Sequence, residues 1–304
     1  MSNIKRFYSL NEFLKERHGS KVMKLSLDGG FTCPNRDGTV ATGGCIFCSS
    51  RGSGDFTSYN AESITEQMTD NIKLLSNKWP NVQQYIAYFQ SYSNTYAPLS
   101  ILKPKYEEAL NFPGVVGLAI ATRPDCLSDD IIDYLGELND RTHLWVELGL
   151  QTIHPQTSTF INRGHDLQCF HDAVYKLHQK GIEVVAHMIV GLPGESIDDQ
   201  LETAKYMSTL PLQGVKIHML HVLDNAPLGR LYLKEPFELM TEDEYVILVG
   251  EILKILPASF VIHRLTGDGD KKHLLAPLWT QNKTKVLNHI QKYLEEQNIY
   301  QGCP

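Results

Sequence analysis

The sequence predicts an α/β fold of the (β/α)6 type, a partial TIM barrel built from six strand and helix units. Short apolar runs alternate with longer amphipathic stretches along most of the chain. The apolar runs are nearly continuous, which indicates parallel strands that are buried on both faces. With 304 residues, of which 42% are hydrophobic, the chain has the size and composition of one globular domain as large as a barrel.

The predicted elements follow one another in pairs. Strands are expected at residues 22–27, 85–89, 115–121, 143–150, 182–190 and 215–220. Helices are expected at residues 61–76, 100–110, 128–138, 166–180, 196–210 and 241–256. Ser128, followed by Asp129 and Asp130, is typical of a helix N-cap. We expect a basic N-terminal extension at residues 1–20, the barrel at residues 21–265 and a C-terminal extension at residues 266–304.

Composition narrows the class of protein. No run of eighteen apolar residues occurs, so the sequence predicts no transmembrane span and no membrane partner. The first residues lead into polar sequence without the apolar core of a signal peptide, and we expect a cytoplasmic protein. Six cysteines, three of them clustered, are too few and too uneven for a disulfide framework.

Charge is unevenly distributed along the chain, whose net charge is −7. Residues 1–24 carry six basic and two acidic side chains, and residues 271–304 carry five lysines and two glutamates, so basic ends flank an acidic body. Trp279 lies in a stretch, residues 271–285, that has lysines and no acidic residue. Such a stretch could follow a phosphate backbone and stack a base, but a solvated helix face with a core tryptophan is the favoured interpretation.

Cys33, Cys45 and Cys48 lie within sixteen residues and predict a metal or cluster loop. Thiolates are the ligands that iron–sulfur clusters and zinc prefer, and the two residues between Cys45 and Cys48 let both sulfurs reach one centre. Three thiolates would leave one iron of a cubane cluster open for a substrate or cofactor. Structural zinc with a fourth ligand from elsewhere remains the alternative.

Unusual polar residues follow every predicted strand. In barrels of this kind the chemistry sits at the carboxyl ends of the strands, because the loops there vary while the barrel stays rigid. In strand order, the candidates are Cys33, Cys45 and Cys48; Gln90; Arg123; Glu147 and Gln151; Gly191 and Glu195; and His218 and His221. Glycines permit close backbone approach to a flat ring, and carboxylates or amides bind a ribose or an ammonium group.

His218, His221, His263 and Arg264 are polar residues late in the predicted barrel. The histidines could shuttle protons, although a lone histidine on an apolar strand is more often a core residue. Arg264 stands at a strand end before a glycine turn, which suits bidentate recognition of a carboxylate.

The cysteine loop and the strand-end motifs together resemble the radical S-adenosylmethionine (SAM) superfamily. The eleven residues between Cys33 and Cys45 are similar to the long-gap loop of its elongator-catalytic-subunit-like branch. The resemblance implies a 4Fe–4S cluster held by Cys33, Cys45 and Cys48, with SAM at the open iron. It also implies that SAM is bound by residues in the second-strand to fifth-strand motifs and the polar turn after the fourth strand, namely Gln90, Arg123, Glu147, Gln151, Arg163, Gly191 and Glu195.

Three further stretches, residues 6–15, 25–38 and 216–221, resemble the bacterial MnmL/YtqA family, which modifies the wobble uridine of tRNA. The resemblance implies conversion of 5-carboxymethylaminomethyl-2-thiouridine to 5-aminomethyl-2-thiouridine by a 5′-deoxyadenosyl radical. In that reaction Arg264, with His218 or His221, would hold the substrate carboxylate. The implied partners are the tRNA anticodon stem-loop, a one-electron donor such as flavodoxin or ferredoxin, and a tRNA methyltransferase acting next.

Two alternatives stay open at this point. The first is a radical SAM enzyme that acts on a small metabolite or another protein. The second is a zinc-stabilised RNA-binding protein without catalytic activity.

Overall fold

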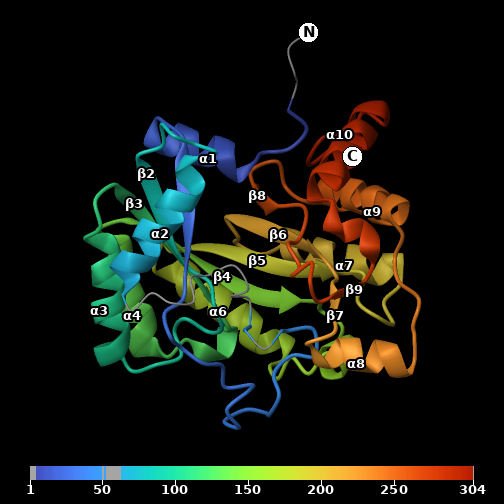
Figure 1. The fold of residues 1–304 in the computed structure, drawn as a ribbon, viewed down its shortest axis with the longest axis horizontal. Helices are drawn as coiled ribbons and strands as arrows, with labels where there is room; N and C mark the ends of the chain where they lie inside the picture. The colour runs from blue at the N-terminus through green and yellow to red at the C-terminus, as the bar shows by residue number, and fades with distance from the viewer. Residues whose placement is uncertain (1–4, 50, 53–62, 304) are drawn as a thin grey trace.

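The computed structural model describes residues 5–49, 51–52 and 63–303. Its centre is a curved sheet of seven parallel strands in the order β1-β2-β3-β4-β5-β6-β8 (Figure 1). The strands are β1 (Val22–Leu27), β2 (Gln84–Phe89), β3 (Val115–Thr122), β4 (His143–Gln151), β5 (Glu183–Val190), β6 (Gly214–Met219) and β8 (Val261–Arg264). The predicted partial barrel is confirmed, with one strand more than the six expected units.

Each of the first six strands is followed by a helix that covers the outer face of the sheet. These helices are α2 (Ile64–Ser76), α3 (Leu99–Leu110), α4 (Asp129–Asn139), α6 (Leu167–Gln179), α7 (Ile197–Ser208) and α9 (Glu242–Ile255). Their ends lie within a few residues of the predicted ends, although residues 61 and 62 lie outside the described part of the chain. Ser128 is the N-cap of α4, as predicted.

The seventh strand, β8, was not counted among the predicted units. It has four residues, too few for an apolar run to stand out, and it pairs with β6 only near the start of that strand. Strands β1 and β8 are the two edges of the sheet and do not pair with each other, so the barrel is incomplete.

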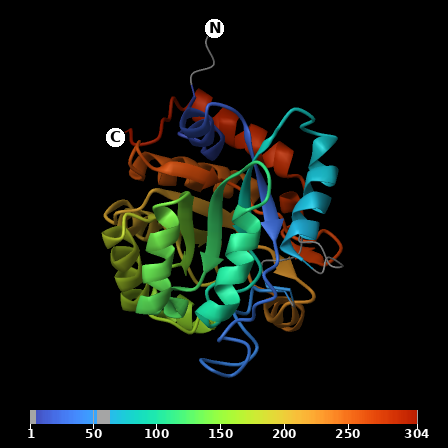
Figure 2. The same ribbon diagram turned by 90° about the vertical axis from the view of Figure 1, so that its left-hand side faces the viewer.

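Helix α1 (Leu10–His18) closes the amino end of the barrel. Ser9 caps the helix through a capping box with Glu12 and also bridges to Ile262 of β8. Leu14 is 3% exposed and packs into the barrel interior with Trp145. Figure 2 shows α1 at the amino ends of the strands and the cysteine loop at their carboxyl ends. Part of the predicted N-terminal extension is therefore a plug.

Four further elements after β6 lie outside the seven-stranded sheet. They are β7 (Val222–Leu223), which pairs antiparallel with β9 (Leu274–Ala276), and the helices α8 (Pro227–Lys234) and α10 (Lys283–Glu296). Short helical segments complete the chain: α5 (Pro155–Phe160), η1 (Pro124–Cys126) and η2 (Leu278–Gln281). Helix α10 packs beside α9.

Trp279 is half-buried and packs against the main hydrophobic core. Its indole nitrogen donates to the Met240 carbonyl oxygen at 3.0 Å, and its ring lies 5.3 Å from that of Tyr245. The structural interpretation of this tryptophan is therefore confirmed. Among the helices in the described part of the chain, none is long and apolar enough to cross a membrane.

Candidate active site in the barrel

A cavity of about 760 Å³ runs from the cysteine loop into the barrel. Of the thirteen site residues predicted from sequence, ten line it: Cys33, Cys45, Cys48, Gln90, Arg123, Gln151, Arg163, His218, His221 and Arg264. Residues far apart in the chain meet here because parallel strands bring their carboxyl ends to one edge of the sheet.

The cysteine loop is fixed to the turn that follows α5. Asn35 donates from its side-chain amide to the Asn162 carbonyl oxygen at 2.6 Å and to the Cys45 sulfur at 3.6 Å. The Cys48 amide donates to the Cys45 carbonyl oxygen at 3.0 Å, which closes the tight turn between these two cysteines. The three thiols, each half-buried, thus face one cavity.

The thiols lie in a cationic environment. Hydrogen bonding from the Cys48 thiol lowers the pKa of Cys45 to about 7 against the effect of burial, and Arg123, Asn35 and Arg36 lower it further. The same hydrogen bond and burial raise the pKa of Cys48. Two neighbouring thiols that share a proton beside guanidinium groups are suited to becoming thiolate ligands.

Arg123 and Arg163 are fixed side by side at the cavity edge. Arg123 makes a bidentate ion pair with Asp125, at 2.8 and 2.6 Å, and donates to the Arg163 carbonyl oxygen at 2.7 Å. Arg163 is 2% exposed and donates to the carbonyl oxygens of Leu150 and Thr152, both at 2.6 Å. Burial lowers the pKa of Arg163 to about 10.

Unusual backbone conformations gather at the same place. Gln151 has a φ of +60°, at a point where the pairing of β4 with β5 shifts register, and Tyr92 and Asn162 have φ of +58° and +51°. Tyr92 and Gln151 line the cavity, and Asn162 precedes Arg163. Such conformations cost free energy in residues other than glycine and concentrate at functional sites. Gln90 is held by Ser26, whose hydroxyl donates to the Gln90 side chain at 3.0 Å.

The wall of the cavity opposite β1 carries His218, His221 and Arg264. Arg264 forms an ion pair with Asp268, which also accepts from Lys283 at 2.8 Å. Burial, together with the Arg264 charge, lowers the pKa of His221 to about 4 and also lowers the pKa of His218. Both histidines are therefore neutral at pH 7.

Gly191 and Glu195 were predicted near SAM, but they are not among the cavity-lining residues in the described part of the chain. The Gly191 amide donates to the Gln200 side chain at 2.7 Å, and φ is +86° at Gly191. Glu195 follows in the same turn, and burial raises the pKa of its carboxyl group. Their contact with SAM stays a prediction.

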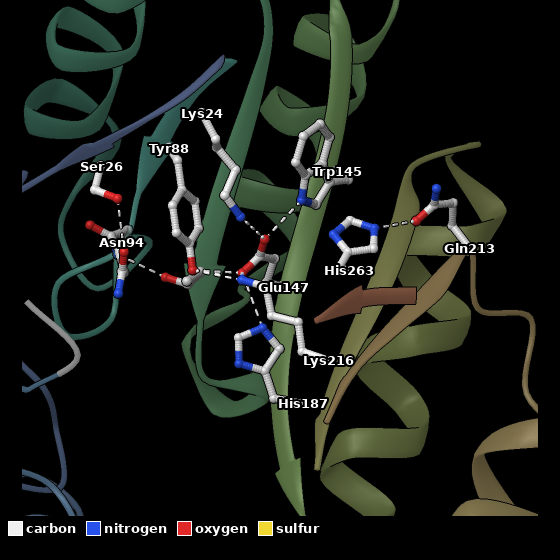
Figure 3. A network of polar contacts seen from close by, with 12 residues as sticks. Lys24, Ser26, Tyr88, Asn94, Trp145, Glu147, His187, Gln213, Lys216 and His263 are labelled. Carbon is white, nitrogen blue, oxygen red and sulfur yellow. Dashed lines mark hydrogen bonds and ion pairs between the residues drawn. The ribbon is translucent and has the colours of Figure 1, made fainter. Parts of the chain in front are cut away.

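Glu147, also predicted near SAM, lies in the barrel interior with its side chain fully buried. Figure 3 shows five side chains directed at its carboxylate: Lys24, Tyr88, Trp145, His187 and Lys216. Tyr88 donates at 2.7 Å, Trp145 and His187 at 3.0 Å, and Lys24 at 3.3 Å, while Lys216 forms a direct ion pair. Although burial alone would raise it, the pKa of Glu147 lies well below its ordinary value because Lys216 and Lys24 stabilise the anion.

Sequence reasoning missed most of this network. The available indication was a lysine in the middle of each of two mostly apolar strands, Lys24 in β1 and Lys216 in β6. A lysine at such a position is rarely buried without a partner, so each required an anion inside the barrel.

The sequence matches two family models and several known proteins. The model of the radical SAM superfamily matches residues 36–207, and that of the radical SAM C-terminal domain matches residues 212–296. The chain is 50% identical to YtqA of Bacillus subtilis over 298 residues, which are 98% of this chain and 92% of that protein. It is 26% identical to a tRNA uridine(34) acetyltransferase of Methanocaldococcus infernus, over 62% of this chain and 35% of that protein.

The fold is similar to that of archaeal Elp3 from Methanocaldococcus infernus. The TM-score is 0.71 at 18% sequence identity, over 93% of this chain and 64% of the Elp3 chain. The superfamily model covers more than half of this chain, and the similarity to YtqA extends over nearly all of it. The chain therefore belongs to the radical SAM superfamily, whose enzymes use a 4Fe–4S cluster and SAM.

Proposed function

We propose that this radical SAM enzyme modifies the wobble uridine of tRNA, converting 5-carboxymethylaminomethyl-2-thiouridine to 5-aminomethyl-2-thiouridine. The charge of the cavity carries the proposal. Among the described residues that line it, seven are lysine or arginine and one is aspartate, in a chain with a net charge of −7. A cationic cavity in an acidic protein favours an anionic substrate, and nucleic acid is the polyanion that such a field attracts most strongly.

The relatives support the choice of a uridine in tRNA. One of them is a tRNA uridine(34) acetyltransferase and another is human Elongator complex protein 3, of which this chain covers 35% and 30%. Because the chain covers only about a third of these relatives, acetyl transfer is not included in the proposal. The proposed partners are the anticodon stem-loop of tRNA, an electron donor such as flavodoxin or ferredoxin, and a tRNA methyltransferase acting next, in the cytoplasm.

The residues of the cysteine loop fit an iron–sulfur cluster. Among the described residues, the one group of three metal-ligating side chains whose donor atoms all lie within 4.8 Å is His154, Asp199 and Glu202. The three cysteine sulfurs are therefore not all within 4.8 Å of one another, although the Cys45 and Cys48 thiols are hydrogen-bonded. Three thiols from one loop are the donor set that iron–sulfur clusters prefer, and the lowered pKa of Cys45 favours its thiolate form.

Cys33, Cys45 and Cys48 would hold the cluster at the open end of the barrel. When bound there, the cluster and SAM would supply the radical chemistry for removing a hydrogen atom from the substrate. Gln90, Arg123, Gln151 and Arg163 line the cavity beside the loop and would orient SAM by hydrogen bonds. Because Arg123 and Arg163 are already held by protein partners, they would present fixed charges that need little reorganisation.

His218, His221 and Arg264 would contact the substrate on the opposite wall. The two histidines are neutral, so each has one ring nitrogen that can accept a hydrogen bond and one that can donate. Trp145 and α1 close the amino end of the barrel and would exclude bulk water from that side.

Nucleoside analysis tests the proposal. tRNA that contains 5-carboxymethylaminomethyl-2-thiouridine is incubated without oxygen with cluster-loaded protein, SAM and dithionite, then digested and analysed by mass spectrometry. We expect this nucleoside to decrease and 5-aminomethyl-2-thiouridine to increase. Unchanged nucleosides, with SAM cleavage intact, would point instead to a metabolite or protein substrate.

A further inference from the structure

We propose that Lys24 and Lys216 bind the carboxylate of the substrate side chain at the deep end of the cavity. This inference rests on the proposed function and names the groups that would recognise the anionic end of the modified uridine. Lys24 extends from β1 at one edge of the sheet and Lys216 from β6 near the other edge, and both line the cavity.

A single carboxylate, that of Glu147, is shared by the two lysines. Glu147 is fully buried and contacts both Lys216 and Lys24 (Figure 3). Burial lowers the pKa of His187 to about 4, so this neighbour adds no charge at neutral pH. Burial, and to a smaller extent Lys24, lower the pKa of Lys216 although Glu147 raises it, so an anion that enters beside Lys216 would favour the charged form of this lysine. With both lysines charged, the network has one carboxylate for two ammonium groups.

The positive charges of the two lysines lie in the barrel interior, where water screens them poorly. The Lys216 side chain is 5% exposed and that of Glu147 is 0% exposed. Lys24, at 22%, is the member most open to the cavity. In such surroundings a charge needs a partner, because its desolvation costs more than at the surface. An entering carboxylate would meet Lys24 first and complete the network.

The cavity provides a path from the cysteine loop to the two lysines. Ser26 follows Lys24 by two residues, and His218 follows Lys216 by two, so both lie on the same strand faces toward the cysteine loop. All four side chains line the cavity. Beyond the lysines, Trp145 and Leu14 fill the barrel. A side chain that enters from the loop would pass polar groups and end at the lysines.

The Arg264 cluster is the competing location for the carboxylate. There too one carboxylate, Asp268, faces two cations, Arg264 and Lys283. The side chains of Asp268 and Lys283 are 39% and 41% exposed, so water screens their charges. An added anion would therefore stabilise the less screened charges of Lys24 and Lys216 more than those of the Arg264 cluster. Arg264 would contact another part of the substrate.

The test compares two anticodon stem-loops that differ only in the side chain of the wobble uridine. In one the side chain ends in a carboxylate, and in the other it ends in the corresponding carboxamide. We expect the cluster-loaded protein to bind the carboxylate form at least about tenfold more tightly, as for one charged hydrogen bond. Lys24→Met should remove this preference, because it leaves the Glu147 and Lys216 pair balanced. Lys24→Arg should retain the preference. Lys73→Gln, a control at an exposed lysine of α2, should also retain it. Arg264→Ala, which changes the competing location, should retain it as well.

A preference that survives in Lys24→Met, or that disappears in Arg264→Ala, would overturn the inference. Neither result bears on whether the uridine is converted, which the nucleoside analysis decides separately.

A second measurement does not need tRNA. N-methylglycine has the amine and the carboxylate of the proposed side chain. The Trp145 indole donates to Glu147 at 3.0 Å, so the indole N–H resonance of Trp145 in an NMR spectrum reports on the network. We expect N-methylglycine to shift this resonance in the wild-type protein but not in Lys24→Met, and N-methylglycinamide to shift it in neither. If the wild-type resonance does not move, or moves equally in Lys24→Met, the inference is wrong. A shift without any stem-loop conversion would support the anion site and contradict the tRNA substrate.

Discussion

Glu147 is the single side chain on which the barrel interior depends most. Replacing it by Gln would leave Lys24 and Lys216 facing each other without an anion. We expect Glu147→Gln to reduce the free energy of unfolding by about 3 to 5 kcal/mol, the cost of breaking a buried ion pair. Urea denaturation of the anaerobically prepared protein measures this loss.

Glu107 provides the matched control for this substitution. It forms a bidentate ion pair with Arg141 on the surface, at 2.8 and 2.9 Å. Glu107→Gln should cost less than about 1 kcal/mol, because water screens exposed pairs. Equal losses at both glutamates would show that burial of the Glu147 network does not set its strength.

The three cysteines of the loop should act as a unit. Cys45→Ala is expected to lose most of the iron that the wild-type protein holds, about four atoms per chain for one cubane cluster, and to abolish SAM cleavage. Cys169→Ala is the control, because Cys169 lies at the start of α6 and does not line the cavity. Iron and sulfide analysis decides the outcome. Retention of iron by Cys45→Ala would contradict the assigned ligands.

Neutral buried histidines should make the protein sensitive to acid. The pKa of His221 is about 4 in the folded chain, lowered by burial and by Arg264 more than Asp268 raises it, whereas an unfolded histidine titrates near pH 6.5. Below that pH the unfolded chain binds the proton first, so stability is full above about pH 6.5 and falls toward pH 4. Between pH 7 and 5.5 this histidine should contribute about 1 kcal/mol of the loss.

Urea denaturation of His221→Asn as a function of pH checks this sign. The variant should lose stability less steeply than the wild type between pH 7 and 5.5, whereas His178→Asn, at an exposed position on α6, should follow the wild-type curve. A steeper curve for His221→Asn would mean that His221 is protonated in the folded protein.

Among the elements, α1 shows how a short polar helix acquires a structural role. Its one buried side chain, Leu14, fills the amino end of the barrel beside Trp145. We expect Leu14→Ala to cost about 2 to 5 kcal/mol, as for other leucines removed from a packed core. Leu74→Ala on α2, where the side chain is 75% exposed, should change the unfolding free energy by less than about 0.5 kcal/mol. Similar small losses at both positions would contradict the plug.

The elements that sequence predicted well are those with long apolar patterns. Six strand and helix pairs were found because a buried parallel strand and an amphipathic helix each leave a clear periodicity. Helix α1 was missed although Ser9 and Glu12 form a capping box, a signal visible in the sequence. Strand β8 was expected only as a strand end at Arg264 and was not counted among the six units, because its four residues owe their conformation to pairing with β6, which no local pattern records.

At the scale of the whole molecule, the sequence located the rim of the cavity better than its interior. The loops at the strand ends carry conspicuous residues such as Cys45 and Arg123, and the barrel geometry brings them together. The interior depends on which face of each strand a residue occupies and on the tilt between strands. Glu147, Lys24 and Lys216 come from three strands, so only the folded sheet shows that they meet.

The most direct test of the account is the yield of 5′-deoxyadenosine for each uridine converted. Cluster-loaded protein is supplied with SAM, dithionite and an anticodon stem-loop that carries 5-carboxymethylaminomethyl-2-thiouridine, and both products are quantified over time. We predict that 5′-deoxyadenosine and 5-aminomethyl-2-thiouridine accumulate together in a ratio of about one, the stoichiometry expected when each radical serves one substrate. SAM cleavage that proceeds at the same rate with an unmodified stem-loop, and yields no aminomethyl product with the modified one, would contradict it.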